Sequence, residues 1–366
     1  MRVIVAPDKF KGTLTGAEAA EAIARGLRSA GADADVSPVA DGGEGTLDAL
    51  VAAAGGSIMG VIARGPLGTP VRAHLGRLDD GTGVVELSQA SGLRLVAETD
   101  LDPLRASTYG TGELLKGALA RRPTKVLIAI GGSATVDGGM GIARALGVRF
   151  LDAAGAELQP CGQNMERVAR IDPERLDSRL VGIPITVAAD VMSLLVGPEG
   201  AARMFGPQKG ATPKVVELLE RGLAVIGERI EQDLGIPVLD APGGGAAGGA
   251  GAMLLGLGAE LRSGAEVVLE AIGFERRLVG ADLVVTGEGL LDAGTTAGKA
   301  PMMVARMAAA AGIPCIALVG DARVRPAEFA DVRTLTEHFG TAAEARERAA
   351  AGLQSLAARL VLERKR

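Results

Sequence analysis

Cysteine and histidine are scarce in this chain of 366 residues. The two cysteines, Cys161 and Cys315, form no CxxC pair, which argues against a disulfide-stabilised secreted protein and against a cysteine zinc site. The two histidines, His74 and His338, are too few for a histidine-rich zinc site. Any catalytic triad that uses histidine would have to be built on one of these two.

Aromatic residues and positive charge are also in short supply. Aromatics make up 2% of the chain and the net charge is −5, so we expect no nucleic-acid partner, which would require stacking platforms and a basic surface. No apolar run approaches the ~18 residues of a membrane span. The N-terminal run is interrupted by Pro7 and Asp8 and therefore predicts a strand rather than a signal peptide. We expect a cytoplasmic protein with no membrane partner.

Glycine, by contrast, is abundant, with 54 residues. Hydrophobic residues make up 48% of the chain, which is enough for a substantial core, and the glycines follow no collagen-like period. They therefore indicate tight loops within a folded protein rather than disorder.

Strands and helices alternate at the start of the chain. Residues 2–6 predict a buried strand, and Thr15 with Glu18 predicts a capping box at the start of a helix. A second strand at residues 35–39 precedes a helix that ends at Ala54. This βαβα order is typical of a doubly wound parallel sheet.

The alternation of strands and helices is interrupted in the middle of the chain and resumes near its end. Residues 58–87 carry turn signals that predict antiparallel hairpins, whereas residues 282–286 and 315–319 again predict strands that alternate with helices. We therefore predict an α/β protein with a doubly wound domain formed by both termini, residues 1–57 and 276–366. A second, mixed α/β domain, residues 58–275, is inserted in it.

Four glycine-rich loops follow predicted strands and carry carboxylates or hydroxyls. They read DKFKGT at 8–13, DGGEGT at 41–46, GGSATVDGG at 131–139 and TGEGLLDAGTTAGK at 286–299. Ligands bind outside the carboxyl ends of strands in open α/β sheets, and helix N-termini hold anions. One such loop alone is better explained as a helix cap with a turn, but four together indicate a ligand site.

The sequence supports neither of two nucleotide-binding fingerprints. Residues 243–248 fit GxGxxG, but they follow Asp240-Ala241-Pro242 instead of a buried strand, which argues against a dinucleotide oxidoreductase. Residues 294–300 approach a P-loop, but the glycines are one residue too close and Ala300 stands where the magnesium-binding hydroxyl belongs.

The ordered segments APDKFKGTLT, PVADGGEGT, GGSATVDGG, FGPQKGA, GGGAAGG and TGEGLLDAGTTAGK resemble the type I glycerate kinases. The resemblance runs from residue 2 to about 320. It implies ATP-dependent phosphorylation of D-glycerate, usually to 2-phosphoglycerate, and a flavodoxin-like domain made of both chain ends with an inserted α/β domain.

The sequence departs from the family pattern at several positions. Val136 and Gly294 stand where the family usually has Asn and Gln, Ser193-Leu194 where it often has Asn-Pro, and Lys9 where it often has Ser. The lost amides leave three alternatives open: a kinase for another small hydroxy acid, formation of 3-phosphoglycerate, or a non-catalytic metabolite-binding regulator. The last is less well supported, because the carboxylates and Lys299 are retained.

The resemblance, together with the chemistry of phosphoryl transfer, predicts the site residues and the cofactors ATP and Mg²⁺. We expect catalytic roles for Asp8, Asp41, Asp190 and Lys299, with the base unranked among the three aspartates. The expected metal ligands are Asp190, Glu288 and Asp292. Expected substrate-binding residues are Lys11, Arg64, Lys209 and Glu44, and expected ATP contacts are Gly132, Ser133, Asp137, Gly287, Glu288 and Lys299. D-glycerate and ATP are the expected partners, and a homo-oligomer is left open.

Overall fold

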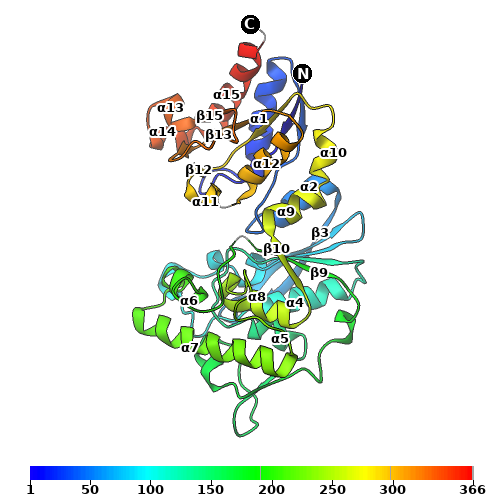
Figure 1. The fold of residues 1–366 in the computed structure, drawn as a ribbon, viewed down its shortest axis with the longest axis vertical. Coiled ribbons are helices and arrows are strands. Elements are labelled where there is room, and N and C mark those ends of the chain that lie inside the picture. The colour runs from blue at the N-terminus through cyan, green and yellow to red at the C-terminus, as the bar shows by residue number, and fades with distance from the viewer. Residues whose placement is uncertain (190, 297, 365–366) are drawn as a thin grey trace. The chain divides into compact units, whose positions relative to one another are not determined.

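The computed structural model describes residues 1–189, 191–296 and 298–364 (Figure 1). The chain divides into two compact units. The first comprises Met1–Asp41, Asp48–Gly55 and Ser263–Arg366, and the second comprises Gly42–Leu47 and Gly56–Arg262. The first unit is thus built from both ends of the chain. Its returning part begins at Ser263, whereas the sequence suggests a boundary at 275/276.

A five-stranded parallel sheet forms the centre of the first unit, with strand order β15-β13-β11-β1-β2. This is the flavodoxin-type order in which the second strand along the chain lies at one edge, outside the first. The doubly wound α/β prediction is confirmed. The strands are β1 (Arg2–Val5), β2 (Asp33–Val36), β11 (Leu283–Thr286), β13 (Cys315–Val319) and β15 (Asp331–Thr334). A short parallel pair, β12 (Leu290–Leu291) and β14 (Asp321–Ala322), accompanies them.

Helices cover this sheet on both faces. The predicted capping box is present, because the Thr15 hydroxyl accepts from the Glu18 amide and Glu18 accepts from the Thr15 amide at the start of α1. Alternate strand residues such as Val3 and Val5 share one apolar cluster with α1 and α15, while α12 packs against β11 and β13 outside that cluster. The helices are α1 (Gly16–Ser29), α2 (Thr46–Ala54), α9 (Gly264–Ala271), α10 (Phe274–Leu278), α11 (Ala293–Thr296), α12 (Ala300–Ala310), α13 (Leu335–Phe339), α14 (Ala342–Glu347) and α15 (Ala349–Arg364).

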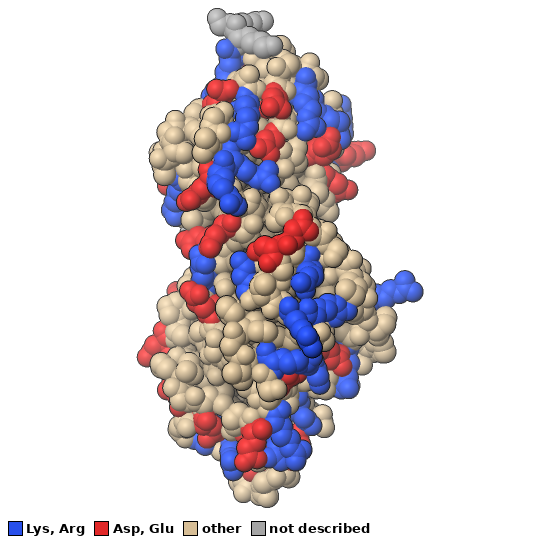
Figure 2. Space-filling view, turned by 90° about the vertical axis from the view of Figure 1, so that its right-hand side faces the viewer, with Lys and Arg blue, Asp and Glu red and all other residues tan. Residues whose placement is uncertain are grey.

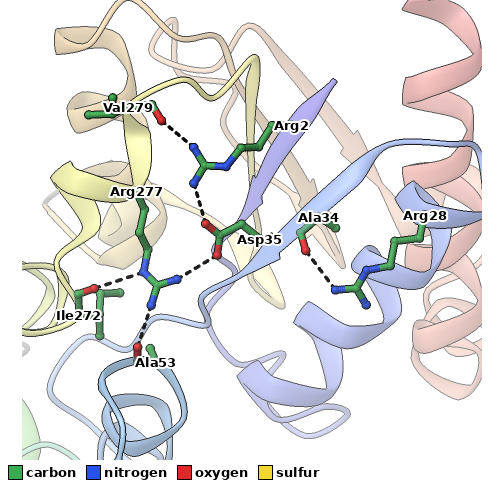
Figure 3. A network of polar contacts seen from close by, with 8 residues as sticks. All are labelled: Arg2, Arg28, Ala34, Asp35, Ala53, Ile272, Arg277 and Val279. Atoms are coloured by element: carbon green, nitrogen blue, oxygen red, sulfur yellow. Dashed lines mark hydrogen bonds and ion pairs between the residues drawn. The ribbon is translucent and has the colours of Figure 1, made fainter. Parts of the chain in front are cut away.

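A polar network ties the two ends of the chain together within this unit (Figure 3). The carboxylate of Asp35 on β2 accepts hydrogen bonds from Arg2 and from Arg277, at 2.8 and 2.9 Å. Arg277 also donates to the carbonyls of Ile272 and Ala53. The guanidinium group therefore joins the segment after α9 to β2 and α2, and this explains why residues 263–275 belong to the first unit.

The second unit contains a six-stranded mixed sheet with strand order β10-β9-β6-β5-β4-β3. The hairpins predicted over residues 58–87 are present as the antiparallel strands β3, β4 and β5, and the sheet continues with parallel pairs from β5 through β6 to β9. The strands are β3 (Gly56–Arg64), β4 (Pro70–Leu78), β5 (Gly83–Glu86), β6 (Val126–Ala129), β9 (Ile185–Ala189) and β10 (Glu260–Ser263), with a separate antiparallel pair, β7 (Arg149–Leu151) and β8 (Arg170–Asp172).

Two apolar clusters form the core of this unit, one on the sheet with α4 and one around α7. Its helices are α3 (Ser88–Ser91), α4 (Tyr109–Leu119), α5 (Met140–Ala145), α6 (Ala201–Phe205), α7 (Pro213–Arg229) and α8 (Ala246–Gly256). Shorter 3-10 turns lie at Leu93–Leu95, Glu98–Asp100, Gly162–Arg167, Ser178–Leu180 and Pro207–Lys209. The GxGxxG match begins in a turn and continues into the first residues of α8, and it does not follow a strand.

Some element boundaries differ from those predicted. The second strand occurs at Asp33–Val36 instead of 35–39, because Pro38 has no N–H to donate to a strand ladder. The helix predicted over 214–234 is α-helical only as far as Arg229. Residues Ile230–Leu234 form a wider π-helical turn, which is followed by Gly235 in a left-handed conformation. Strand β15 and helix α13 were not predicted.

Among the residues that the structure describes, no helix combines the length and apolar character needed to cross a bilayer. Figure 2 shows that acidic and basic side chains both occur across the face that it presents.

Candidate active site

Three carboxylates gather at the carboxyl ends of neighbouring strands in the first unit. Asp8 follows β1, Asp41 follows β2, and Glu288 follows β11. The backbone amide of Asp8 donates to the carbonyl of Gly287 at 2.8 Å, which holds the loops after β1 and β11 side by side. Lys9 Nζ lies 3.3 Å from Asp41 Oδ1. The parallel sheet thus brings together three of the predicted site residues.

Two of these carboxyl groups, Asp8 and Glu288, have raised pKa values. Burial, with a further contribution from the neighbouring Asp41 carboxylate, raises the pKa of Asp8 to about 7. Burial also raises the pKa of Glu288 to about 7, although a hydrogen bond from Thr295 and the charge of Lys299 act in the opposite direction. Both groups are therefore able to exchange protons near neutral pH.

Glycines allow the loops to approach one another. A Cβ atom on Gly287 would lie 2.0 Å from the carbonyl oxygen of Leu318, and one on Gly320 would lie 2.4 Å from the carbonyl oxygen of Gly289. A side chain at either position would collide with the backbone of a neighbouring loop. Gly287, which we expected to approach ATP, is thus required by the packing of the loops themselves, and its contact with ATP stays a prediction.

The segment after Glu288 contains the short helix α11 and leads to the predicted lysine, Lys299. Thr295 Oγ1 donates to Glu288 Oε1 at 2.6 Å, a contact that we did not predict. Asp292 Oδ1 accepts from the amides of Gly294 and Thr295 and lies 3.9 Å from Lys299 Nζ. Glu288, Asp292 and Lys299 are therefore close neighbours, and Lys299 stands directly before α12.

In the second unit, Ser133 and Lys209 meet as a buried pair. Lys209 Nζ donates to Ser133 Oγ and to the carbonyl of Thr135, both at 2.8 Å, and the lysine side chain is only 2% exposed. The backbone at Gly132 is left-handed, with φ at 74°. Lys209 therefore supports the glycine-rich loop in this structure, and its expected contact with substrate stays a prediction.

The carboxylate of Asp137 is hydrogen-bonded to neighbouring residues of the second unit. Its fully buried carboxylate accepts from the amide and hydroxyl of Thr108, at 2.7 and 2.9 Å, and from the amides of Gly139 and Gly141. Burial raises its pKa. The carboxylate oxygens hold the start of α5 against Thr108, so this geometry gives Asp137 a structural role, and the ATP contact that we expected of it stays a prediction.

The loop at residues 42–47 is held by a residue that we did not predict. Glu86, at the end of β5, is fully buried, and its carboxylate accepts from the amides of Gly45 and Leu47 at 3.2 and 3.0 Å and from the Ser88 hydroxyl. The same loop carries Glu44, which pairs with Arg94. The sequence feature that could have indicated this role is the single acidic residue, Glu86, within the apolar run VVEL.

The remaining predicted residues lie at or near the surface, or outside the described part of the chain. Arg64 Nε is 3.4 Å from Glu113, and its guanidinium group lies 4.3 Å from the centre of the Tyr109 ring. Lys11 is exposed. Asp190, expected as a catalytic residue and a metal ligand, lies outside the described residues.

Comparisons with known proteins identify the family of the chain. Residues 3–363 match the model of the Glycerate kinase family. The chain belongs to this family. It is 47% identical over 324 residues to a glycerate kinase from Bacillus subtilis (strain 168) and 44% identical over 324 residues to a glycerate 2-kinase from Escherichia coli (strain K12), each time with 87% of this chain and 85% of the relative covered.

A solved structure gives the same result for the fold. The crystal structure described as glycerate kinase 2 from Salmonella typhimurium LT2 matches with a TM-score of 0.88 and 40% identity, covering 100% of this chain and 98% of that one. The flavodoxin-like prediction and the resemblance to the glycerate kinases are confirmed.

For a glycerate kinase family member, two of the departures have clear structural consequences. Val136 is fully buried within an apolar cluster, so its side chain packs in the core. Gly294 lies beside the site, because a Cβ atom there would be 3.1 Å from Asp292 Oδ1 and 3.3 Å from Lys299 Nζ. The replacement of Gln by Gly294 is therefore the departure that changes the surroundings of Lys299.

ATP is commonly bound by kinases together with Mg²⁺, an ion that takes carboxylate ligands. Within residues 1–189, 191–296 and 298–364, no three His, Cys, Asp or Glu side chains are arranged to enclose a metal. Mg²⁺ does not require such a cage, because it is usually held by one or two carboxylates with water and phosphate oxygens. The raised pKa values of Asp8 and Glu288 show crowded, buried carboxyl groups, which a cation would stabilise in their charged form.

Proposed function

We propose that this protein transfers the γ-phosphoryl group of ATP to a hydroxyl group of D-glycerate, giving 2-phosphoglycerate. The observation that carries the proposal is the group formed by Asp8, Asp41 and Glu288 at the ends of adjacent parallel strands. A group of this kind provides both a proton acceptor and ligands for the cation that accompanies ATP. The family membership supports the same reaction.

Asp8 is our choice for the general base. Removal of the proton from the acceptor hydroxyl is most effective when the pKa of the base lies near the working pH, and the pKa of Asp8 is raised to about 7. Its amide contact with Gly287 fixes the position of the residue. Asp41, paired with Lys9, would keep the pKa of Asp8 high through its negative charge. Asp190 remains a predicted catalytic partner.

Glu288 and Asp292, with Asp190, are our proposed ligands for Mg²⁺, which supplies charge neutralisation on the phosphates when it is bound. Lys299 would neutralise further charge on the transferred phosphoryl group. Its distance of 3.9 Å from Asp292 leaves it loosely paired, so it can turn toward a phosphate without breaking a short ion pair.

The following substrate and nucleotide contacts are proposed. Glycerate is an anion, so its carboxylate would be met by cationic side chains such as Lys11, Arg64 or Lys209, with Glu44 as a hydrogen-bond acceptor. The amide of Gly132 and the hydroxyl of Ser133 would hold phosphate oxygens. Because the reaction consumes ATP, we expect the protein to act in the cytoplasm.

The test is an assay of the purified full chain with ATP, Mg²⁺ and D-glycerate in which ADP release is measured. We expect turnover with D-glycerate, and ³¹P NMR of the product should place the phosphate on the second carbon. Turnover with another small hydroxy acid and none with D-glycerate would contradict the proposed substrate. Phosphate on the third carbon would contradict the proposed product.

Lys299→Met tests the role of the lysine within this reaction. Charge-assisted contacts to a developing phosphoryl charge contribute a few kcal/mol, so turnover at saturating ATP and glycerate should fall by roughly a hundredfold or more. Stability should change little, because the side chain is partly exposed and its ion pair with Asp292 is long.

Lys125→Met is the matched control, since Lys125 forms a comparable surface ion pair with Asp80 at 3.5 Å. We expect its turnover to equal that of the unmodified protein. Near-normal turnover of a folded Lys299→Met variant would show that this lysine does not handle the phosphoryl group.

A further inference from the structure

Strand β3 is a long edge strand with an apolar, exposed surface. It lies at the end of the six-stranded sheet and, within the described residues, pairs only with β4 (Figure 1). Its nine residues, Gly56–Arg64, are largely exposed, and Ile58 and Ile62 expose 41% and 70% of their surface. Such a surface is unusual, because exposed edges normally carry features that prevent association.

The hydrogen-bond pattern shows which residues of β3 face the free edge. The amide of Gly65 donates to Thr69, just beyond the β3–β4 pair, and the amide of Leu78 donates to Thr82, just beyond the β4–β5 pair. In antiparallel strands, hydrogen-bonded and non-hydrogen-bonded pairs alternate. The odd-numbered residues of β3 therefore bond to β4. The amides and carbonyls of Ile58, Gly60 and Ile62 point away from the sheet.

The protective features of natural edge strands are missing from β3 except at its last residue, Arg64. Residues 56–63 read GSIMGVIA and contain no charged residue and no proline, and all nine residues pair with β4 in continuous register without a bulge. An uninterrupted edge of this kind is a template for a further antiparallel strand.

We propose that this edge is covered by the same strand of a second copy of the chain, which forms a two-fold symmetric dimer around Gly60. The pattern of the strand is self-complementary: with Gly60 opposite its own copy, Ile58 faces Ile62 of the partner subunit and Ile62 faces Ile58 of the partner subunit. The outward amides and carbonyls of these three residues meet in hydrogen-bonded pairs. A two-fold axis requires this kind of self-complementary surface.

The neighbouring strand supports the same register. On the face that carries the isoleucines, Arg72 of β4 lies opposite Ile62 and Gly76 lies opposite Ile58. In the proposed dimer, each cross-strand row reads Arg72, Ile62, then Ile58 of the partner subunit and Gly76 of the partner subunit. Two aliphatic side chains meet at the centre of each row. The two Arg72 side chains lie in different rows, so the pairing brings no like charges directly opposite each other.

The centre of the interface has room for the approach. A Cβ atom on Gly60 would meet no atom within 4 Å, and its φ is not positive, so side chains are tolerated here. This makes Gly60 a suitable position for substitutions that act only on the free edge. The interface lies within the second unit, and its central residues Ile58, Gly60 and Ile62 have no proposed role in the reaction.

The experiment is to measure the molar mass of the full chain by sedimentation velocity and light scattering over a range of concentrations. We expect a dimer for the unmodified protein. Gly60→Pro removes an outward amide that β4 does not use, and Ile62→Lys places a charge in the centre of the pairing. Both variants should have about half the molar mass, with unchanged circular dichroism. Val181→Lys, a charge placed at a turn residue that is 81% exposed, should remain dimeric.

A crosslink tests the register directly. In a hydrogen-bonded antiparallel pair the Cα atoms are about 5.5 Å apart, which a disulfide can span. Gly60→Cys should form a covalent dimer on mild oxidation, because the native Cys161 and Cys315 are buried. Val181→Cys should not. A monomeric unmodified protein, a folded Ile62→Lys variant that stays dimeric, or a dimeric Gly60→Cys variant that fails to crosslink would each overturn the proposal.

Discussion

The pKa of Asp8 depends on the position of this residue at the end of strand β1. Asp8 is 5% exposed, and its pKa is raised from 3.8 to about 7 by burial and by the Asp41 carboxylate. Below about pH 4 the carboxyl group holds its proton in both the folded and the unfolded chain. Between about pH 4 and pH 7 only the folded state retains it, so a rise in pH favours unfolding.

Asp8→Asn should remove this pH dependence, because asparagine keeps the shape and stays neutral. We expect the free energy of unfolding of the variant to rise relative to that of the unmodified protein between pH 4 and pH 8. The gain should reach a few kcal/mol, since one pKa unit corresponds to about 1.4 kcal/mol. Urea unfolding in EDTA at several pH values measures it, with the exposed Asp79→Asn as control. If the difference in free energy of unfolding between Asp8→Asn and the unmodified protein did not change with pH, the raised pKa of Asp8 would be contradicted.

At this scale, sequence reasoning selected carboxylates that the structure brings together, but not their hydrogen-bond partners. Asp8, Asp41 and Glu288 were predicted because strand-end carboxylates follow from the alternation of strands and loops. The contacts of Glu288 with Thr295 and of Glu86 with the loop at 42–47 were not, since both depend on how chain segments pack. The bonds that bury the Asp137 carboxylate escaped prediction for the same reason, because burial is not visible in a local motif.

At the scale of elements, α1 shows where propensity and packing disagree. Gly26 lies inside the helix, where replacement by alanine ordinarily stabilises by up to ~1 kcal/mol. Here, however, a Cβ atom would lie 2.1 Å from the carbonyl oxygen of Gln354 and 2.9 Å from the Ala357 Cβ, both on α15. The glycine marks a close approach of the two helices.

Gly26→Ala should therefore destabilise the protein by roughly 1–3 kcal/mol, as overpacking does in a filled core. Gly16→Ala is the control in the same helix, because the nearest atoms to its added Cβ are 3.6 Å away. We expect that control to be neutral or slightly stabilising. Thermal and urea unfolding of both variants measures whether each substitution raises or lowers the free energy of unfolding. Equal stabilisation by both would show that α15 can move to accept the added Cβ atom without loss of stability.

Elements were predicted best where local signals agree. The Thr15 capping box and the strand at residues 315–319 follow from caps, periodicity and apolar content. Strand β15 escaped prediction because DVRT is short and half polar, and it is a strand only because it pairs with β13 at the edge of the sheet. The register of β3 and β4 likewise depends on a partner strand that no local pattern names.

At the scale of the whole molecule, the two units differ in how the chain builds them. The six-stranded sheet and both apolar clusters of the second unit use residues from 56 to 263, one continuous stretch. The first unit needs both ends, because β1 lies between β2 and β11 in its sheet. We propose that the two units are domains, a division that the return of the βα rhythm near residue 282 already suggested.

Residues 42–262 expressed alone should consequently fold, whereas residues 263–366 alone should not. The first fragment keeps its sheet, its apolar clusters and the Glu86 contacts with the loop at 42–47. The second lacks β1, β2 and α1, so β11 keeps β13 but loses its other neighbour, β1, and the apolar cluster loses the face that packs on α15. Circular dichroism and urea unfolding should show one cooperative transition for the first fragment and none for the second. An unfolded 42–262 fragment would mean that the second unit is stable only as part of the whole chain, and the division into domains would then fail.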